Sequence, residues 1–437
     1  MKSFFEGTST KKIRQRAIVV GVYKKDAGIA PDDRLLDEIA SLCKTAGAKV
    51  VGRLTQFVDK FNAATLLGSG KSEALAELVR ERVADLVVFD SDLSPSQQVN
   101  LEKKTSRQVV DRPGIILDIF ALHARTREAK AQVELAQLEY LFPRLAGGWT
   151  HLERQEGSIG TRGPGETQLE TDRRLVRKRI RDLKRKLDDI ETERITQRKK
   201  REGIFKICLV GYTNAGKSTI FNLLTGDNVV AESYLFATLD STTRRIRISG
   251  RNELLLSDTV GFIRKLPVSL VASFKSTLME VSGADLLLHV IDISEVDFEQ
   301  RIATVNNILG EIGGGNIPVI YIFNKIDLRH DPDLFRALLG RFPKARFVSA
   351  ETEEGIGKII SDLENYLESG KVTITAKIKS EIREKINLIS SLGHIIDSVS
   401  NDGVFQVKAR VPRTAIGRLQ AEGIELIETE DRYESEK

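Results

Sequence analysis

Residues Gly211 to Ser218 read GYTNAGKS, which fits the phosphate-loop pattern G-x-x-x-x-G-K-[ST]. The apolar segment FKICLV precedes this stretch and the helix-forming segment STIFNLL follows it, as the pattern requires. In such a loop the backbone N–H groups surround phosphates, and Lys217 brings a positive charge to the β- and γ-phosphates. Ser218 offers a hydroxyl to Mg²⁺. The pattern therefore predicts a nucleoside-triphosphate site.

A second pattern, D-x-x-G, runs from Asp258 to Gly261. It senses the γ-phosphate in guanine-nucleotide switches, where a glutamine commonly follows and orients the attacking water. Here the next residue is Phe262, which cannot hydrogen-bond a water. A threonine between the two patterns should complete the coordination shell of Mg²⁺ and should dissociate from the ion after hydrolysis. By spacing alone the choice stays open among Thr238, Thr242 and Thr243.

The base-reading residues follow later in the chain. NKID, Asn324 to Asp327, ends the apolar segment VIYIF. The Asp327 carboxylate can accept hydrogen bonds from the guanine N1–H and exocyclic amine, a pair that adenine cannot donate. SAE, Ser349 to Glu351, follows the segment ARFV, and its backbone N–H groups would reach the guanine O6. All these motifs occur in the expected order at expected strand ends, so the sequence predicts a GTPase.

The chain divides into four segments, and their patterns of strands and helices predict an α/β protein. We expect a small N-terminal α/β domain (1–120) with short strands at 16–23, 49–58, 85–90 and 107–112 and helices between them. A long helical hairpin with a glycine-rich loop and a basic helix follows (121–202). Next comes a P-loop GTPase domain with a central, mostly parallel sheet (203–370). A small C-terminal α+β domain ends the chain (371–437), with strands at 371–378, 404–411 and 424–429 and helices at 381–398 and 414–422.

The second helix of the expected hairpin is strongly basic. Arg173 to Arg201 holds 14 Lys and Arg against 5 Asp and Glu. Its apolar residues from Val176 to Ile190 step by four, three, four and three, a heptad seam. A solvated face is the ordinary interpretation of a charged helix, but this excess beside a Gly/Arg-rich loop favours contact with a nucleic-acid phosphate backbone.

A third stretch, LLGSGKSEAL (Leu66 to Leu75), contains GKS but has Thr65 where the phosphate-loop pattern needs glycine. We expect a turn before a helix there, with a second nucleotide site as the alternative.

The two cysteines, Cys43 and Cys208, favour buried thiols over a disulfide or a zinc site. No apolar run approaches a membrane span and no secretory leader is evident, so a soluble, cytoplasmic protein is expected.

The chain resembles the HflX family of translational GTPases within the Obg-HflX group. The resemblance rests on GYTNAGKSTIFN, FATLDSTTR, DTVGFI, NKID and SA, and on the linker GTRGPGETQLETDRR (Gly160 to Arg174), and it covers nearly the whole chain. It implies that Thr238, in the middle of FATLD, is the magnesium threonine. Family members often have proline where this chain has Ser241, a mild departure that leaves the loop less rigid.

The resemblance also implies site residues and partners. Catalytic roles fall to Lys217, Thr238 and Gly261, and the Mg²⁺ ligands are Ser218 and Thr238. The implied nucleotide-binding residues are Gly211, Tyr212, Thr213, Asn214, Ala215, Gly216, Lys217, Ser218, Phe236, Ala237, Thr238, Leu239, Asp240, Asp258, Thr259, Val260, Gly261, Asn324, Lys325, Ile326, Asp327, Ser349, Ala350 and Glu351.

The implied partners are GTP and GDP, the large ribosomal subunit and the 70S ribosome with its rRNA. A monomer is expected, and the implied role is the splitting of stalled or idle ribosomes during stress. An apolar residue at Phe262 is typical of GTPases that hydrolyse slowly alone, so the ribosome would stimulate turnover. Asn214 can help to hold K⁺ near the phosphates. The alternatives are a GTPase acting on precursor large subunits, an RNA remodeller with a nucleotide site in its N-terminal domain, and a signalling switch.

Overall fold

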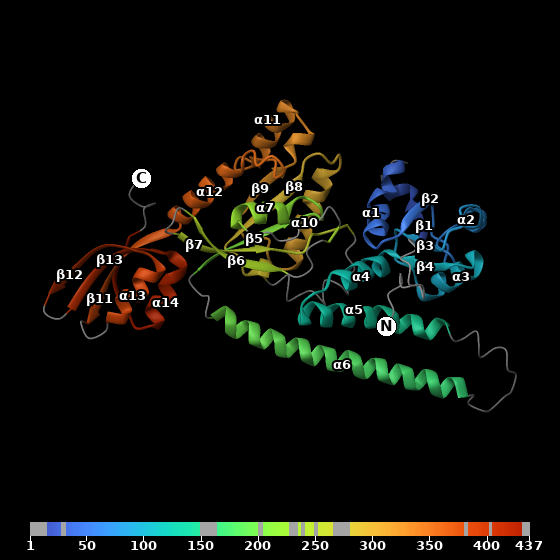
Figure 1. The fold of residues 1–437 in the computed structure, drawn as a ribbon, viewed down its shortest axis with the longest axis horizontal. Helices are drawn as coiled ribbons and strands as arrows, with labels where there is room; N and C mark the ends of the chain where they lie inside the picture. Colours follow the sequence, from blue (N-terminus) through green and yellow to red (C-terminus); the bar gives the residue numbers. More distant parts are fainter. Residues whose placement is uncertain are drawn as a thin grey trace. The chain divides into compact units, whose positions relative to one another are not determined.

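The computed structural model describes residues 15–27, 32–148, 164–199, 204–226, 235–236, 241–248, 252–264, 280–379, 383–401 and 404–430. The chain divides into two compact units. The first comprises Met1–Ile190 with Glu232–Asp240 and Lys265–Lys275, and the second comprises Glu191–Ala231, Ser241–Arg264 and Ser276–Lys437. The α/β class expected from the sequence is confirmed (Figure 1). The bounds of the four expected domains stay a prediction.

The N-terminal part of the first unit is a four-stranded parallel sheet in the order β2-β1-β3-β4. Its strands are β1 (Arg16–Lys24), β2 (Lys49–Val58), β3 (Leu86–Phe89) and β4 (Gln108–Asp111). The helices are α1 (Asp37–Thr45), α2 (Ser69–Glu81), α3 (Pro95–Thr105) and α4 (Arg112–His123), with short 3-10 turns at Lys25–Ala27 and Asp33–Leu36. The βαβ alternation predicted these strands correctly. The GKS stretch forms the start of α2, with Gly68 as its N-cap, as expected of a turn before a helix.

Two long helices, α5 (Arg127–Gly148) and α6 (Pro164–Lys199), lie side by side and run in opposite directions (Figure 1). The predicted heptad seam is confirmed, because Leu183 is buried and packs with the α5 residues Ala131, Leu135 and Leu138. Ion pairs from Arg179 to Glu134 at 2.7 Å and from Lys184 to Glu139 at 2.9 Å flank that seam. Residues 149–163 of the predicted glycine-rich loop lie outside the described residues.

The second unit contains a six-stranded sheet in the order β10-β9-β8-β5-β7-β6, parallel except for the edge strand β6. The strands are β5 (Phe205–Gly211), β6 (Thr242–Ile248), β7 (Asn252–Asp258), β8 (Leu286–Asp292), β9 (Val319–Asn324) and β10 (Arg346–Phe347). The helices are α7 (Lys217–Thr225), α10 (Phe298–Glu311), α11 (Pro332–Arg341) and α12 (Ile356–Ser369), with a 3-10 turn at Ile326–Leu328. β8 is buried along its whole length, as expected of a central parallel strand with both faces covered.

This topology brings the motifs together. The four motifs begin at or after the carboxyl ends of β5, β7, β9 and β10, which are parallel strands of one sheet with β8 between β9 and β5. Ligands of open α/β sheets bind outside that edge. The fold therefore gathers segments that are far apart in sequence at one place.

The C-terminal part is an antiparallel sheet in the order β12-β13-β11-β14. It is formed by β11 (Lys371–Lys379), β12 (His394–Asn401), β13 (Val404–Pro412) and β14 (Glu425–Glu430), with helices α13 (Arg383–Leu392) and α14 (Ile416–Ala421) and a 3-10 turn at Arg413–Ala415. The expected α+β character is confirmed, but the helix predicted over 381–398 is wrong from Gly393 onward. The helix ends before Gly393, where a Cβ would lie 2.3 Å from the Arg410 carbonyl oxygen, and the chain turns there into β12.

Candidate functional site

The phosphate loop lies between β5 and α7, and two of its glycines are required by close packing. Gly216 has a φ of +94°, and a Cβ there would lie 2.1 Å from Asn324 Nδ2. Gly211 has a φ of +149°, and a Cβ there would lie 2.2 Å from the Val290 carbonyl oxygen. The loop is therefore pressed against β8 and the NKID segment, a conformation that side chains at these positions would prevent.

Lys217 and Ser218 occupy the first turn of α7, the end of a helix at which backbone N–H groups and the helix dipole favour an anion. The Lys217 ammonium donates to the Tyr212 carbonyl at 2.8 Å, and burial lowers the pKa of Lys217 to about 8. The Ser218 hydroxyl donates to Asp258 Oδ2 at 2.6 Å. Asp258, at the end of β7, is fully buried. The two sequence motifs thus meet through a direct hydrogen bond.

These groups suit a magnesium ion bound together with a nucleotide. Mg²⁺ prefers oxygen ligands and is commonly held by one or two protein groups plus substrate phosphates. Ser218 Oγ and the Asp258 carboxylate are such oxygens, brought together at one end of the loop. Within the described ranges, no group of three or more His, Cys, Asp and Glu side chains could hold a metal by itself. GTPases generally use Mg²⁺, and the donor set fits that use.

The D-x-x-G segment is bound to the phosphate loop by backbone hydrogen bonds. Phe262 N–H donates to the Gly211 carbonyl at 3.1 Å, and Thr213 N–H donates to the Phe262 carbonyl at 2.8 Å. The Phe262 side chain is 1% exposed and so is part of the core. Gly261 lies so close that a Cβ would be 3.0 Å from Lys217 Nζ. Phe262 therefore holds the γ-phosphate sensor against the loop, a structural role that the motif alone did not reveal.

The base end of the site centres on Asn324, at the end of β9. Its amide Nδ2 donates to the Ala215 carbonyl at 2.8 Å, and its Oδ1 accepts from Ala350 N–H at 2.9 Å. Asn324 thus joins the phosphate loop, NKID and SAE in one unit. Lys325 pairs with Asp292 at 2.6 Å. Asp327 has a buried Oδ1 that accepts no hydrogen bond from the residues described in the structure, as expected of an oxygen reserved for a ligand.

The segment with the implied magnesium threonine is only partly described. Ala237, Thr238, Leu239 and Asp240 lie outside the described residues. Phe236 is buried, and its ring meets Phe120 of α4 edge-on, with 4.8 Å between the centroids. Leu235 N–H donates to Thr45 Oγ1 of α1 at 3.3 Å. The structure therefore places Leu235 and Phe236 against the first unit's own helices, and a nucleotide-binding role for Phe236 stays a prediction.

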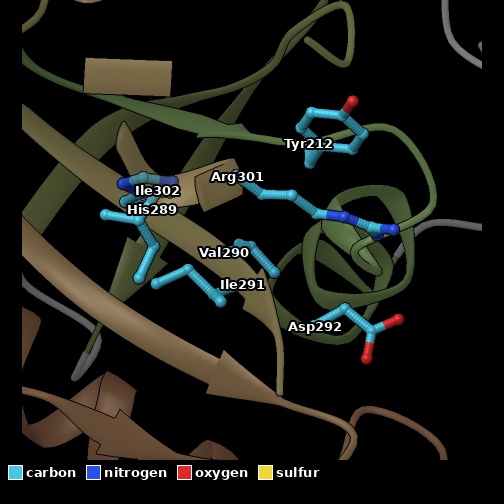
Figure 2. Close-up of a pocket in the computed structure, with 7 residues that line it drawn as sticks. All are labelled: Tyr212, His289, Val290, Ile291, Asp292, Arg301 and Ile302. Carbon is cyan, nitrogen blue, oxygen red and sulfur yellow. The ribbon is translucent and has the colours of Figure 1, made fainter. Parts of the chain in front are cut away.

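Sequence reasoning missed a cluster around Tyr212. The Tyr212 hydroxyl accepts from Arg264 N–H at 2.8 Å, and the Arg301 guanidinium of α10 lies over the Tyr212 ring, 4.9 Å from its centroid. Arg301 is held by Asp297 at 2.8 Å. Tyr212 and Arg301 also line a small pocket, and Figure 2 shows its lining residues: Tyr212, His289, Val290, Ile291, Asp292, Arg301 and Ile302. Arg301 is far from Tyr212 in sequence, so no local pattern could have predicted this contact.

The site defines a class of protein: a P-loop GTPase, with phosphate, γ-phosphate and guanine motifs at one sheet edge. The GTPase HflX of Escherichia coli K12 is 42% identical over 405 residues, covering 91% of this chain and 94% of that protein. The chain belongs to the HflX family of GTPases. The GTPase HflX of Flavobacterium psychrophilum is 51% identical over 313 residues, covering 72% of this chain and 76% of that protein.

Family models agree with this membership. Models described as "GTP-binding GTPase N-terminal", "GTP-binding GTPase Middle Region" and "50S ribosome-binding GTPase" match residues 33–121, 123–201 and 206–325. A crystal structure described as an SsGBP and GDP complex is 26% identical, with a TM-score of 0.47, and covers 80% of this chain and 98% of that chain. No helix of the described part of the chain is long and apolar enough to cross a membrane.

Proposed function

We propose that this GTPase binds the large ribosomal subunit and the 70S ribosome, and that its GTP-bound state splits stalled or idle ribosomes under stress. The protein would act as a cytoplasmic monomer, and GTP hydrolysis to GDP would release it. The observation that carries the proposal is a basic stripe on α6, considered together with the family model for 50S-binding GTPases that matches the chain.

The stripe consists of four exposed cations, Arg174, Lys178, Arg181 and Arg185. They step by four, three and four, the same rhythm as the buried seam that faces α5. At 3.6 residues per turn this set lies on the side of α6 opposite that seam. The four charges extend along about 16 Å of helix, at roughly 1.5 Å per residue.

Such a row can follow a phosphate backbone. The cations that flank the seam are already engaged with α5, since Arg179 pairs with Glu134 and Lys184 pairs with Glu139. The outer stripe faces away from α5 and is exposed along its length. Ribosomal RNA is the phosphate-rich partner that this charge pattern suits, and release of its counterions on binding would drive association.

At the nucleotide, five of the predicted residues would perform four tasks. Lys217 would neutralise charge on the β- and γ-phosphates, Ser218 and Thr238 would hold Mg²⁺, and Gly261 would sense the γ-phosphate through its backbone. Asp327 selects guanine. Bound Mg²⁺ supplies positive charge to the phosphates during the transfer.

Turnover without the ribosome is slow in this proposal, because Phe262 is buried and apolar and cannot orient a water. A group supplied in trans is worth roughly 10³–10⁵ in rate in other GTPases. Asn214 is the candidate K⁺ ligand. It is exposed, with a left-handed φ of +62°, so its side chain is free to meet an incoming nucleotide or ion.

Cosedimentation tests the proposal. The protein is mixed with purified 70S ribosomes or large subunits in a non-hydrolysable GTP analogue or in GDP, and particles are separated on a sucrose gradient. We expect binding to both particles with the analogue, loss of the 70S peak in favour of separate subunits, and weaker binding with GDP. Binding to precursor large subunits alone would instead indicate an assembly factor.

A further inference from the structure

The absence of a catalytic side chain at position 262 raises the question of which group of this chain contacts the γ-phosphate in its place. Thr213 is the third residue of the phosphate loop, and it is 3% exposed. Its hydroxyl oxygen is buried and has no hydrogen-bond partner among the residues that the structure describes. A threonine hydroxyl can rotate to find a partner, so a buried one without any is unusual.

Thr213 lies where the γ-phosphate machinery converges. A Cβ built on Gly261 would be 2.8 Å from both Cα and Cγ2 of Thr213 and 3.0 Å from Lys217 Nζ. The Thr213 N–H is held by the Phe262 carbonyl at 2.8 Å. The position of Thr213 is therefore fixed by the D-x-x-G segment itself, beside the glycine and the lysine that address the γ-phosphate.

Packing alone does not explain a hydroxyl at this position. Valine has the same shape as threonine and would fill the same space without a buried polar atom that needs a partner. A ligand that arrives with the nucleotide would satisfy the hydroxyl. The neighbouring residues make a γ-phosphate oxygen the ligand that fits.

We propose that Thr213 is a catalytic residue that donates a hydrogen bond from its hydroxyl to a γ-phosphate oxygen during hydrolysis. The water oxygen bonds to the γ-phosphorus while the bond from phosphorus to the β–γ bridging oxygen breaks. The electron pair of that bond stays on GDP, and the water proton leaves with inorganic phosphate. Thr213 loses no atom, and its donor stabilises the charge that builds on the equatorial oxygens. This inference depends on GTP hydrolysis at the site and not on the ribosomal role.

The test compares Thr213→Val, which removes the hydroxyl, with Thr213→Ser, which keeps it. Single-turnover GTP hydrolysis and GDP affinity are measured with and without large ribosomal subunits. Loss of one preorganised donor costs about 10²–10³ in rate in well-studied enzymes, so we expect Thr213→Val to slow hydrolysis by at least about tenfold. Its GDP affinity should stay within about twofold of the wild type, and Thr213→Ser should retain most of the rate.

The control is Thr304→Val on α10, where the hydroxyl only donates to the Gln300 carbonyl of its own helix. It should hydrolyse GTP like the wild type. Hydrolysis by Thr213→Val at the wild-type rate would overturn the proposal. So would equal losses in the Val and Ser variants, or a parallel loss of GDP affinity, since either result would assign Thr213 to loop packing. If ribosomes fail to stimulate the wild type, the contrast between Val and Ser remains measurable in the basal rate.

Discussion

A single side chain, that of Asn324, joins two parts of the site. Its amide group forms hydrogen bonds with both the phosphate loop and the SAE segment. The sequence placed the motifs at strand ends, and the structure shows the contacts that join them. It also assigns core roles that the motifs could not, as for Phe262 and His289, both 1% exposed. Three predictions belong to single residues.

The first concerns base choice. Asp327→Asn should weaken GTP binding by at least about a hundredfold while improving the relative binding of xanthosine triphosphate, because a site built on buried hydrogen bonds rejects a mispaired ligand strongly. Competition between the two nucleotides, followed by fluorescence, measures this. An Asp327→Asn protein with wild-type GTP affinity would show that NKID does not read the base.

The second concerns Phe262. Truncation to alanine leaves a cavity in the core and should cost about 3–5 kcal/mol of unfolding free energy, whereas Phe262→Leu should cost much less. The chemistry itself should change little in Phe262→Leu, since neither side chain can bond a water. Urea unfolding and GTP turnover of both variants separate the two effects. A large loss of turnover in a stable Phe262→Leu protein would reveal a catalytic task for the ring.

The third concerns pH. Burial, with a smaller effect of the Lys217 charge, lowers the pKa of His289 to about 3. The folded pKa is below the unfolded value of about 6.5, so the unfolded chain binds the proton more tightly. The stability from a neutral His289 is present above pH 6.5 and should be lost by about 1.4 kcal/mol per pH unit below it. Urea unfolding at pH 8 and pH 5.5 should show this fall.

His289→Phe should flatten that pH dependence, because phenylalanine cannot take up a proton. The substitution keeps an aromatic ring beside Tyr321, whose ring centroid lies 5.4 Å from that of His289. His394→Gln, at an exposed position on β12, is the matched control and should leave the slope unchanged. Equal slopes for the wild type and His289→Phe would exclude His289 as the responsible group.

Among helices and strands, regular periodicity predicted most elements correctly but misplaced the end of one helix. The βαβ rhythm predicted the N-terminal strands, and the heptad steps predicted the α5–α6 seam. The helix predicted over 381–398 was wrong because apolar spacing continues past Gly393, where close approach to Arg410 ends the helix and pairing with β13 makes a strand. The contact of Arg301 with Tyr212 joins α10 to the loop after β5, and only the sheet order brings these together.

The prediction at this level concerns the outer stripe of α6. Reversing Arg174, Lys178, Arg181 and Arg185 to glutamate should weaken ribosome binding and reduce the slope of its salt dependence by up to about four, or about one per lost phosphate contact. GTP affinity should hardly change. The control is reversal of the exposed Lys344 and Lys358 in the second unit. Unaltered ribosome affinity in the stripe variant would leave α6 as a solvated helix.

At the scale of the whole molecule, the proposed function requires GTP hydrolysis in the second unit to be coupled to ribosome binding by the basic helix α6 of the first. The described motifs of the GTPase site are joined by hydrogen bonds, and Phe262 cannot orient a water. In the proposed function, the exposed stripe on α6 meets a phosphate-rich partner. A partner that binds the stripe on α6 and also supplies the group that orients water would couple binding to GTP hydrolysis. The ribosome is that partner in the proposed function.

Single-turnover GTP hydrolysis with and without purified large ribosomal subunits, in K⁺ and in Na⁺ buffers, tests this link. We predict slow turnover by the protein alone and an increase of roughly 10³-fold or more when large subunits are added. Replacement of Asn214 by alanine should remove any extra stimulation by K⁺ and spare nucleotide binding. Fast turnover without ribosomes, or a rate indifferent to large subunits, would contradict the proposed function and leave only the GTPase.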